Sequence, residues 1–379
     1  MRDSNTKKLL LQALVVVAIA LSAVVLAQQG QTPAQRGQKP AQAPPASRAQ
    51  FIATLPLGTP GPSIPAGKAP EQGYVPEGWF PHEGSLLKYR VNIRWGFEPE
   101  SMPEGTSWGR VSDVATDAQG NVYVFQRGTH AEPICIFDAN GKYLRGFGKG
   151  MFGSPHGIRL DKEGNIWTVD TVNQQVLKFT NDGKLLQSWG TLKVTGTDEK
   201  TFNRPTNLAW DSKGNWYVTD GYGNGRVVKF DAAGKYVTSF GTWGEGSGEF
   251  HLPHVVAIDS RDRLYISDRE NNRIQVLDTD GKVIKIWTHL GSTQAIVITP
   301  KDEMWIDTHR NNTENITYDT IEGRLMKIDL ETGKILGGVE CPGHGMAVGP
   351  NGHIYVASLT GNVFRWYPDP KWPVKAVYP

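Results

Sequence analysis

The chain has 379 residues and a formal net charge of +2, and only 21% of its residues are charged. That length suits two domains or one large all-β domain, and the 43 glycines with regularly spaced turn signals favour the all-β class. No block of basic residues occurs, which excludes nucleic acid as an expected partner.

Residues 1–27 form a candidate export signal. Two lysines precede an apolar run that ends in Val25-Leu26-Ala27, where small residues suit signal peptidase. Cleavage there predicts a periplasmic or extracellular protein without stable membrane association, and the alternative is an uncleaved N-terminal membrane anchor. Residues 28–72, rich in Pro, Gln and Ala, predict a flexible linker. Residues 73–379 remain for the folded domain.

From residue 110 onward, a four-strand pattern recurs six times. Each unit begins with an apolar strand, an Asp-x-x-Gly-Asn turn and a β-branched or aromatic strand, as in "IRLDKEGNIWTV" and "LAWDSKGNWYVT". Its second half has the form of "VVKFDAAGKYVTSFG". Units of ~40–50 residues with four short strands are typical of propeller blades. We therefore predict an all-β, six-bladed β-propeller.

The last copy is incomplete, because only a Pro-rich tail follows "VFRWYP". The strand "LLKYRVNIRWG", residues 86–96, has no unit of its own. We predict that this N-terminal strand completes the last blade and closes the ring, since an open ring would expose two sheet edges. Joints such as "GEGSGEFHLPH" resemble the NHL repeat family. That resemblance implies an NHL-type propeller and no particular activity.

Three histidines stand at one phase of the repeat. The residues that enter the innermost strands of blades one to six are Ser112, His156, Thr206, His254, Thr293 and His344. Alternate blades of a six-fold ring place three side chains symmetrically around the axis, as a three-nitrogen site with open positions above it. Zinc accepts three protein ligands in catalytic sites, and other borderline divalent metals also suit. Taken singly, each histidine reads as a turn residue packed on a proline; the threefold recurrence favours a metal.

The ends of the second strands share the face of these histidines. Arg127 stands there in blade one, Arg269 in blade four, and Tyr222 closely follows the same position in blade three. Two guanidinium groups beside a metal favour an anionic substrate, since they match carboxylates bidentately. A phenol in this place can act as a base. The alternatives are salt bridges from the arginines to Asp268 or Asp170 and a stacking role for Tyr222 at the rim.

Several segments together closely resemble peptidyl-α-hydroxyglycine α-amidating lyase, namely "SPHGIRLD", "DGYGNGRVVKF", "LPHVVAID", "SDRENNRIQVL" and "VFQRGTH". That family consists of six-bladed propellers that release glyoxylate from a hydroxyglycine-extended peptide and leave a C-terminal amide. The resemblance implies a zinc-dependent carbon–nitrogen lyase that acts on a small anionic substrate or a peptide C-terminus, and we expect a monomer. The residues carried over are His156, His254 and His344 for zinc, Tyr222 as the base, and Arg127 and Arg269 for the carboxylate.

The same family binds a structural calcium ion near the axis. The resemblance places backbone-carbonyl ligands at Val114 and Ile158, but the Asp that should follow the last histidine is Gly345 here. We predict that Asp113 supplies the missing carboxylate, because Ca²⁺ needs hard oxygen ligands. The disulfide that flanks the tyrosine in animal members has no counterpart, so that loop must be held in another way.

Three further features leave alternatives open. Residues 309–323 are the longest insertion in any blade, and we expect them to form a wall or lid of the site. Cys135 and Cys341 pair in one interpretation and are two small buried residues in the simpler one. The rivals to a lyase are a non-catalytic NHL-propeller binding protein, a metal-dependent hydrolase or lactonase, and an enzyme that keeps its metal without turnover. Lactonases of this shape use a Glu/Asp/Asn calcium site, whereas the ring here is histidine.

Overall fold

The computed structural model describes residues 89–92, 95, 101–309, 323–341 and 343–368. This part of the chain falls within one compact unit and is almost entirely β-structure, with a single 3₁₀ turn, η2 (Arg269–Asn271). No helix within it is long and apolar enough to span a membrane. The predicted export signal (residues 1–27), the predicted linker (residues 28–72) and residues 310–322 of the insertion lie outside the described residues.

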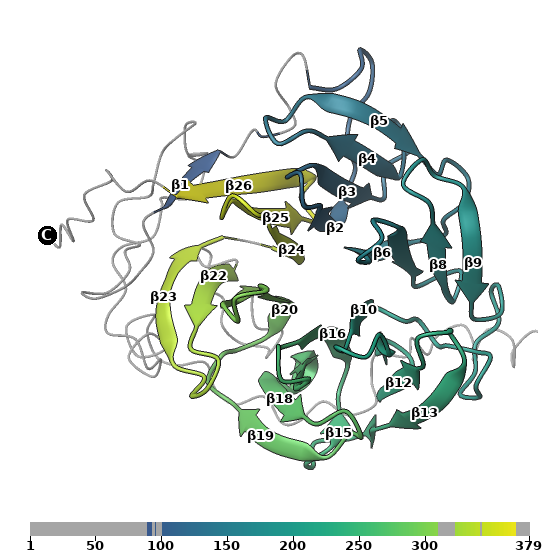
Figure 1. Ribbon diagram of the computed structural model, residues 1–379, viewed down its shortest axis with the longest axis vertical. Coiled ribbons are helices and arrows are strands. Elements are labelled where there is room, and N and C mark those ends of the chain that lie inside the picture. Colours follow the sequence, from purple (N-terminus) through teal and green to yellow (C-terminus); the bar gives the residue numbers. More distant parts are fainter. Residues whose placement is uncertain (1–88, 93–94, 96–100, 310–322, 342, 369–379) are drawn as a thin grey trace, which may run out of the picture. The chain divides into compact units, whose positions relative to one another are not determined.

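Six four-stranded antiparallel sheets surround a common centre, with one edge strand of each sheet innermost (Figure 1). Blade one comprises β2 (Val111–Thr116), β3 (Val122–Gln126), β4 (Ile134–Phe137) and β5 (Tyr143–Phe147). Blade two comprises β6 (Pro155–Leu160), β7 (Ile166–Asp170), β8 (Gln175–Phe179) and β9 (Leu185–Trp189). Blade three comprises β10 (Asn207–Trp210), β11 (Trp216–Asp220), β12 (Arg226–Phe230) and β13 (Tyr236–Phe240). A short parallel pair, β14 (Thr242–Trp243) and β15 (Glu249–Phe250), leads into blade four.

Blades four to six complete the ring. Blade four comprises β16 (Pro253–Ile258), β17 (Leu264–Asp268), β18 (Arg273–Leu277) and β19 (Val283–Trp287). Blade five comprises β20 (Thr293–Ile298), β21 (Met304–His309), β22 (Gly323–Ile328) and β23 (Ile335–Glu340). Blade six comprises β24 (Gly345–Val348), β25 (Ile354–Ser358) and β26 (Asn362–Pro368), with β1 (Tyr89–Asn92) beside β26. Each inner strand contacts the inner strand of the next blade, and β24 contacts β2, so the series returns to its start. The predicted all-β six-bladed propeller is confirmed.

The N-terminal strand is described only in part. Residues 89–92 pair antiparallel with β26, with Tyr89 opposite Pro368. Trp95 is buried between blades one and six, and its ring lies 5.2 Å from that of Phe137 and 5.1 Å from that of Tyr355. Because most of the segment 86–96 lies outside the described residues, its role in closing the ring stays a prediction.

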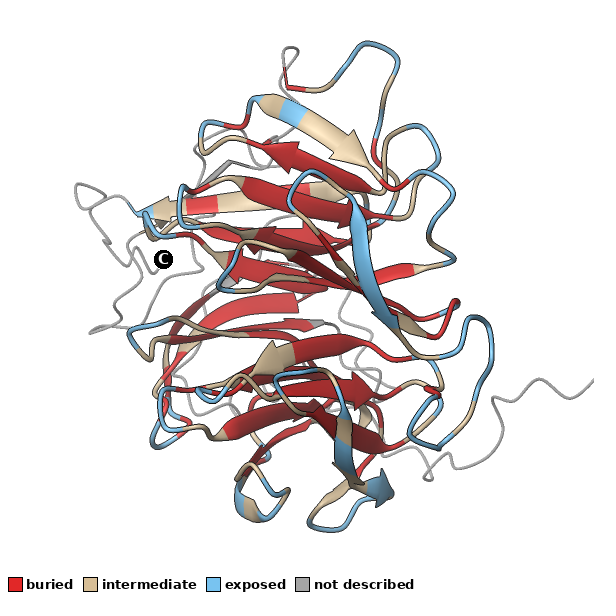
Figure 2. Ribbon diagram, turned by 45° about the vertical axis from the view of Figure 1, so that its right-hand side comes forward, coloured by how far each residue is buried: buried red, intermediate tan, exposed pale blue. Residues whose placement is uncertain are grey.

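The hydrophobic core consists of six clusters, each between two neighbouring blades. Middle strands such as β7 are buried on both faces, whereas outer strands such as β9 and β13 are more exposed (Figure 2). Removing apolar side chains from water at every blade junction is therefore what holds the ring together. Cys135 and Cys341 are buried in two different clusters, as the simpler interpretation predicted.

The repeated Asp-x-x-Gly-Asn turns lie between the first and second strands of the blades. In blade two, the Asp161 carboxylate accepts hydrogen bonds from the backbone amides of Glu163 and Asn165 at 3.1 and 2.8 Å. Gly164 has φ +78°, a conformation that favours glycine. These polar turns fix the strand register that brings the other ends of the inner strands together.

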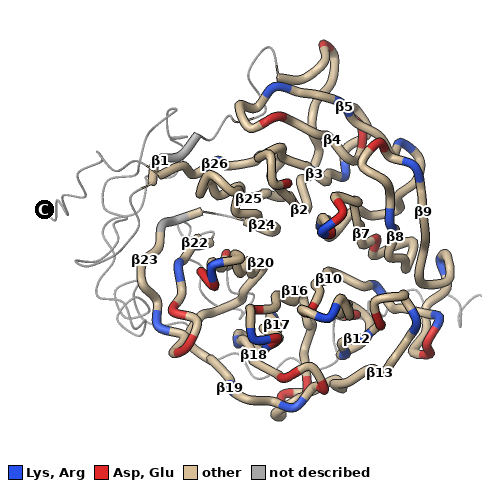
Figure 3. The backbone as a smooth tube through the Cα atoms, in the orientation of Figure 1, with Lys and Arg blue, Asp and Glu red and all other residues tan. Residues whose placement is uncertain are grey.

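Acidic and basic residues are interspersed around the described part of the ring, with no region of one sign (Figure 3).

Candidate metal centre and active site

The three predicted metal ligands stand where inner strands begin. The pairing of β6 with β7 shifts at His156, and the pairing of β16 with β17 shifts across His254. His344 directly precedes β24, and its backbone amide donates to the carbonyl of Ala357 at 2.7 Å. An irregularity of this kind re-aims a side chain relative to its neighbours in the strand. The two register shifts thus turn the imidazoles of His156 and His254 out of the normal strand alternation, while His344 stands just before its strand.

These three imidazoles meet in a nearly equilateral triangle. Their ring centroids lie 4.9, 4.9 and 5.0 Å apart. All three side chains are buried, with exposed fractions of 3% for His156, 2% for His254 and 5% for His344. One nitrogen from each ring lies within 4.8 Å of those of the others. The structure therefore brings together the three residues that the repeat phase selected.

The next blade orients each imidazole through a backbone carbonyl. The Nδ1 atoms of His156, His254 and His344 lie 2.8, 2.8 and 2.7 Å from the carbonyl oxygens of Thr206, Gln294 and Ser112. A carbonyl oxygen only accepts, so Nδ1 carries the proton and Nε2 keeps its lone pair. Such a partner on the far nitrogen is the usual support of a metal-binding histidine.

The blade-five position in this pattern differs from the prediction by one residue. We expected Thr293 to match the histidines, but the pairing of β20 with β21 shifts between Thr293 and Ala295. Gln294 therefore takes that place and offers its carbonyl to His254. The distance to the next turn gives the same assignment, since Gln294 stands five residues before Thr299 and His156 stands five residues before the equivalent Asp161.

The buried triangle fits a divalent metal ion. Burial lowers the pKa of His156 well below its usual value, and the neighbouring His344 and Arg127 lower it further. Burial lowers the pKa of His254 in the same direction, with Arg269 as the next cause. A metal needs neutral imidazoles, and these two are held neutral. The donor set suits zinc or another borderline metal, and its identity is open.

Tyr222 lies beside two members of this triangle. Its hydroxyl oxygen is 3.2 Å from Nε2 of His156 and 3.4 Å from Nε2 of His254. The Nη1 atom of Arg269 donates to the same oxygen at 3.3 Å. The phenol, two candidate ligands and a guanidinium from blades two, three and four are thus within hydrogen-bonding reach.

Backbone contacts hold the Tyr222 loop in place of the missing disulfide. The amide of Tyr222 donates to the carbonyl of Arg204 at 3.3 Å, and the next amide donates to Asn203 at 3.0 Å. The side chain of Asn224 donates to the buried Asp220 carboxylate at 2.8 Å. At Gly221 a Cβ atom would overlap the carbonyl oxygen of Pro253, so only glycine lets this loop approach blade four.

Arg127 is anchored with its charged end left available. Its Nε donates to Ser112 Oγ at 2.7 Å and to the carbonyl of Pro155 at 2.8 Å. Its terminal Nη atoms make no hydrogen bond to the described residues. Burial is the main cause that lowers its pKa, and the charge of Tyr222 acts in the opposite direction. An anchored guanidinium with two unused terminal nitrogens is suited to bind a carboxylate.

Arg269 is paired with a neighbour that the sequence analysis did not single out. Its Nε and Nη2 donate to Glu270 Oε1 at 2.9 and 2.7 Å. Asp268, the partner that the alternative interpretation named, pairs with Arg273 at 2.5 Å. Asp170 accepts backbone amides, including that of Ser154 at 2.9 Å. Glu270 thus balances the charge of Arg269, while Nη1 of Arg269 remains directed at the Tyr222 hydroxyl.

Arg204 also lies beside Tyr222, and the sequence analysis did not single it out. Its guanidinium carbon lies 4.9 Å from the centre of the Tyr222 ring, and that of Arg269 lies 5.4 Å away. Arg204 is exposed and forms no ion pair within the described part of the chain. The signal was present in the sequence: Arg204 stands just before the inner strand of blade three, in the motif "NRPT".

The predicted calcium ligands lie together but do not fit calcium. A guanidinium nitrogen, Nη1 of Arg159, lies 2.6 Å from Asp113 Oδ2 and 2.6 Å from the carbonyl oxygen of Ile158. The amide of Val114 donates to Asp113 Oδ1 at 2.9 Å. Calcium takes six to eight oxygen ligands. Two of the three proposed oxygens are here already bonded to an arginine.

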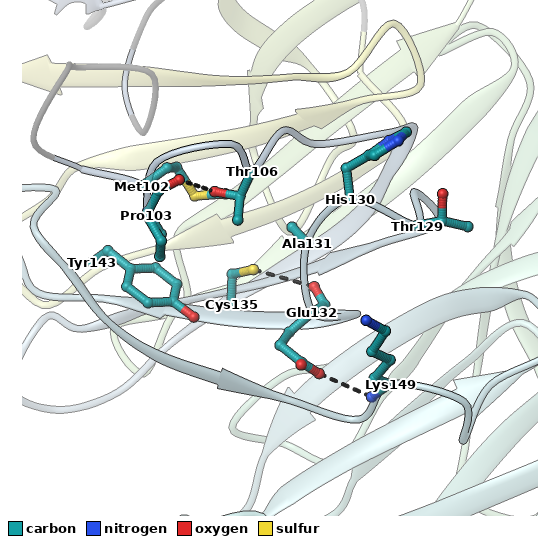
Figure 4. A pocket seen from close by; sticks show the side chains of 10 residues that line it. All are labelled: Met102, Pro103, Thr106, Thr129, His130, Ala131, Glu132, Cys135, Tyr143 and Lys149. Carbon is teal, nitrogen blue, oxygen red and sulfur yellow. Dashed lines mark hydrogen bonds between the residues drawn. The ribbon is translucent and has the colours of Figure 1, made fainter.

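A separate pocket of about 390 Å³ lies beside blade one (Figure 4). Its lining comes from Met102–Thr106, from the loop Thr129–Glu132, and from Tyr143 and Lys149 among others. Buried Gln126 holds that loop by donating to the carbonyls of Gly128, Ala131 and Glu132. None of the predicted site residues lines this pocket.

Two family models match the chain. One, described as a 6-bladed beta-propeller, matches residues 191–328, and the NHL repeat model matches residues 152–179. A probable peptidyl-alpha-hydroxyglycine alpha-amidating lyase of Caenorhabditis elegans is 28% identical over 289 residues, which cover 66% of this chain and 80% of that protein. This chain is an NHL-repeat six-bladed β-propeller with moderate similarity to the amidating lyases.

Other relatives of this propeller match over smaller shares. The rat peptidylglycine alpha-amidating monooxygenase is 35% identical over 206 residues, which cover 46% of this chain and 21% of that protein. Human NHL repeat-containing protein 3 is 32% identical over 216 residues, 54% of this chain and 60% of that one. The chain therefore matches about a fifth of the length of the rat enzyme.

Among solved structures, a Xanthomonas campestris gluconolactonase superposes with a TM-score of 0.53 at 13% identity. The match covers 82% of this chain and 98% of that one. At that identity the likeness shows the propeller fold alone.

Proposed function

We propose that this protein is a metal-dependent lyase for carbinolamide substrates of the peptidyl-α-hydroxyglycine type. It would cleave the N–C bond of the hydroxyglycine unit to give an amide and glyoxylate. The observation that supports this most directly is the Tyr222 hydroxyl, which lies 3.2 and 3.4 Å from Nε2 of two buried histidines and 3.3 Å from Arg269. The similarity to a probable amidating lyase of C. elegans supports the same reaction class.

Cleavage of the N–C bond needs a base, a Lewis acid and a group that binds the substrate carboxylate. A divalent ion held by His156, His254 and His344 would supply Lewis-acid chemistry to a substrate hydroxyl. Tyr222 would accept the hydroxyl proton while the C–N bond breaks and a C=O bond forms. The departing amide nitrogen takes up a proton, so the products are an amide and an aldehyde acid, with no water or oxidant consumed.

The two arginines have separable tasks in this proposal. Arg127 would bind the substrate carboxylate through the terminal nitrogens that its anchoring contacts leave unused. Arg269 would stabilise negative charge on the Tyr222 oxygen through Nη1, while Glu270 keeps its guanidinium in place. Both groups sit where water is partly excluded, which strengthens their electrostatic effect.

The proposal is tested with the purified protein, metal analysis and α-hydroxyhippurate as substrate. We expect zinc in a stoichiometric amount and the release of benzamide and glyoxylate in equal quantities. Bound metal with no glyoxylate would contradict the lyase. Hydrolysis of lactones under the same conditions would instead support the metal-dependent hydrolase.

Replacing Arg127 with glutamine is expected to raise KM for α-hydroxyhippurate more than it lowers kcat. A hydrogen bond to a charged group contributes about 1.5–3 kcal/mol, so kcat/KM should fall about 10- to 100-fold. Steady-state kinetics measure the effect. Arg127→Lys keeps the positive charge but loses the bidentate geometry of the guanidinium, so it should retain only part of the wild-type kcat/KM. An unchanged KM would show that the carboxylate binds elsewhere.

Replacing Arg204 with glutamine should weaken the reaction less. Its exposed guanidinium adds positive charge beside Tyr222 and makes a cation–π contact with the Tyr222 ring that contributes roughly 0.5–1 kcal/mol. We therefore expect kcat/KM to fall about 2- to 5-fold. The loss should shrink as salt concentration rises, because salt screens exposed charges. A loss that is independent of salt would point to a misplaced Tyr222 loop instead.

We further propose the cellular setting that the N-terminal sequence predicts. Residues 1–27 would direct export and residues 28–72 would tether the propeller in the periplasm or outside the cell, with the protein acting as a monomer. Its partners would be small anionic molecules or peptide C-termini, and not nucleic acid. Mass spectrometry of the mature N-terminus after expression with export tests the first step, and retention of residues 1–27 would contradict it.

A further inference from the structure

A second charged cluster lies on the axis beside the histidines. Asp113 comes from β2, Arg159 from β6 and Gly345 from β24, and all three share a small cavity with the three imidazoles. Asp113 is 2% exposed, whereas the Arg159 side chain is 19% exposed. The ion pair therefore joins two neighbouring blades at the centre of the ring.

Every oxygen of this carboxylate has a donor. Asp113 Oδ1 accepts the Val114 amide at 2.9 Å, and Oδ2 accepts the Ile158 amide at 3.1 Å and Arg159 Nη1 at 2.6 Å. The same Nη1 donates to the Ile158 carbonyl at 2.6 Å. Burial raises the pKa of Asp113, and Arg159 is the first of the causes that lower it again. A buried carboxylate of this kind requires a cation beside it.

Gly345 explains why Asp113 can occupy this position. A Cβ atom at Gly345 would overlap Asp113 Oδ1 and approach the Ser112 carbonyl oxygen to 2.6 Å. A carboxylate on blade one and a side chain at position 345 are therefore mutually exclusive. The loss of the expected Asp at 345 and the presence of Asp113 form one coupled change, and Arg159 supplies the positive charge that this change requires.

We infer that the Arg159 guanidinium is a built-in cation that takes the place of the axial calcium ion implied by the resemblance to amidating lyases. The chain then needs no calcium to join blades one and two at the axis, and the histidine triangle is the one candidate metal site among the residues that the structure describes. This inference does not depend on the proposed lyase activity, because it concerns the ion that stabilises the ring.

The first test is calcium dependence of the intact protein. Protein dialysed against calcium and desalted should contain no stoichiometric calcium, and its melting temperature should be the same with millimolar calcium or with EGTA. Calcium bound in a stoichiometric amount, or a melting temperature that EGTA lowers, would overturn the inference. Neither measurement uses enzymatic activity, so failure of the lyase proposal leaves it intact.

The second test removes the cation. Arg159→Met leaves the Asp113 carboxylate unpaired, and the melting temperature should fall by about 10 °C. The double variant D113N/R159M removes both charges and should regain most of that loss, since the two effects are coupled. Arg159→Lys serves as the charge-conserving control. Equal melting temperatures for the wild type and Arg159→Met would overturn the inference, and the double variant remains informative should Arg159→Met fail to fold.

Discussion

Replacing His254 with alanine is expected to abolish stoichiometric metal binding and lower kcat/KM by at least about 10³-fold. Two imidazoles would remain, and a metal site with two protein ligands lies below the three that catalytic zinc sites use. Metal catalysis contributes several kcal/mol of transition-state stabilisation, which corresponds to that factor. Inductively coupled plasma mass spectrometry and α-hydroxyhippurate turnover measure the two effects in one preparation.

The matched control for this variant is His130→Ala. His130 is exposed and lies in the loop after β3, outside the histidine triangle. Metal content and turnover should therefore stay at wild-type values. Circular dichroism should show that both variants keep their β-structure, because the six inter-blade clusters are untouched. Full turnover by His254→Ala would exclude a catalytic metal at this triangle and leave the binding-protein alternative.

The six blades and the histidine triangle are visible in the sequence because both depend on periodicity. Regular turns at Asp161 and its equivalents mark where each inner strand ends, so residues that stand a fixed number of positions before these turns must meet at the axis. The same logic places Arg127, Tyr222 and Arg269 on one face. Thr293 was misplaced by one residue, because blade five has Thr299 in place of the turn aspartate, and counting five residues back from Thr299 gives Gln294, as counting back from Asp161 gives His156.

Contacts of long charged side chains are harder to predict from the sequence. Glu270 beside Arg269, Arg204 over the Tyr222 ring and Arg159 between Asp113 and Ile158 all depend on where long side chains turn. Arginine side chains have many rotamers, and the space open to them is set by the neighbouring blade and not by the repeat. The repeat therefore predicts backbone positions well and predicts the partners of long charged side chains poorly.

Replacing Tyr222 with phenylalanine is expected to lower kcat about 10²- to 10⁴-fold, the usual contribution of a positioned general acid or base. The variant removes only the oxygen that lies 3.2 and 3.4 Å from Nε2 of His156 and His254. The phenylalanine ring keeps its packing beside the guanidinium groups of Arg204 and Arg269. Metal content and melting temperature should therefore remain close to those of the wild type, and KM should change little.

This variant also separates the two interpretations of Tyr222. A residue that merely stacks at the rim acts through its ring, so Phe would preserve kcat, whereas a base acts through its hydroxyl. The control is Tyr236→Phe, since Tyr236 lies at the start of the outer strand β13 and its hydroxyl contacts Ser239 Oγ at 3.4 Å, outside the site residues. Wild-type kcat in Tyr222→Phe with metal bound would assign the proton transfer to another group, and the mechanism proposed above would then be wrong.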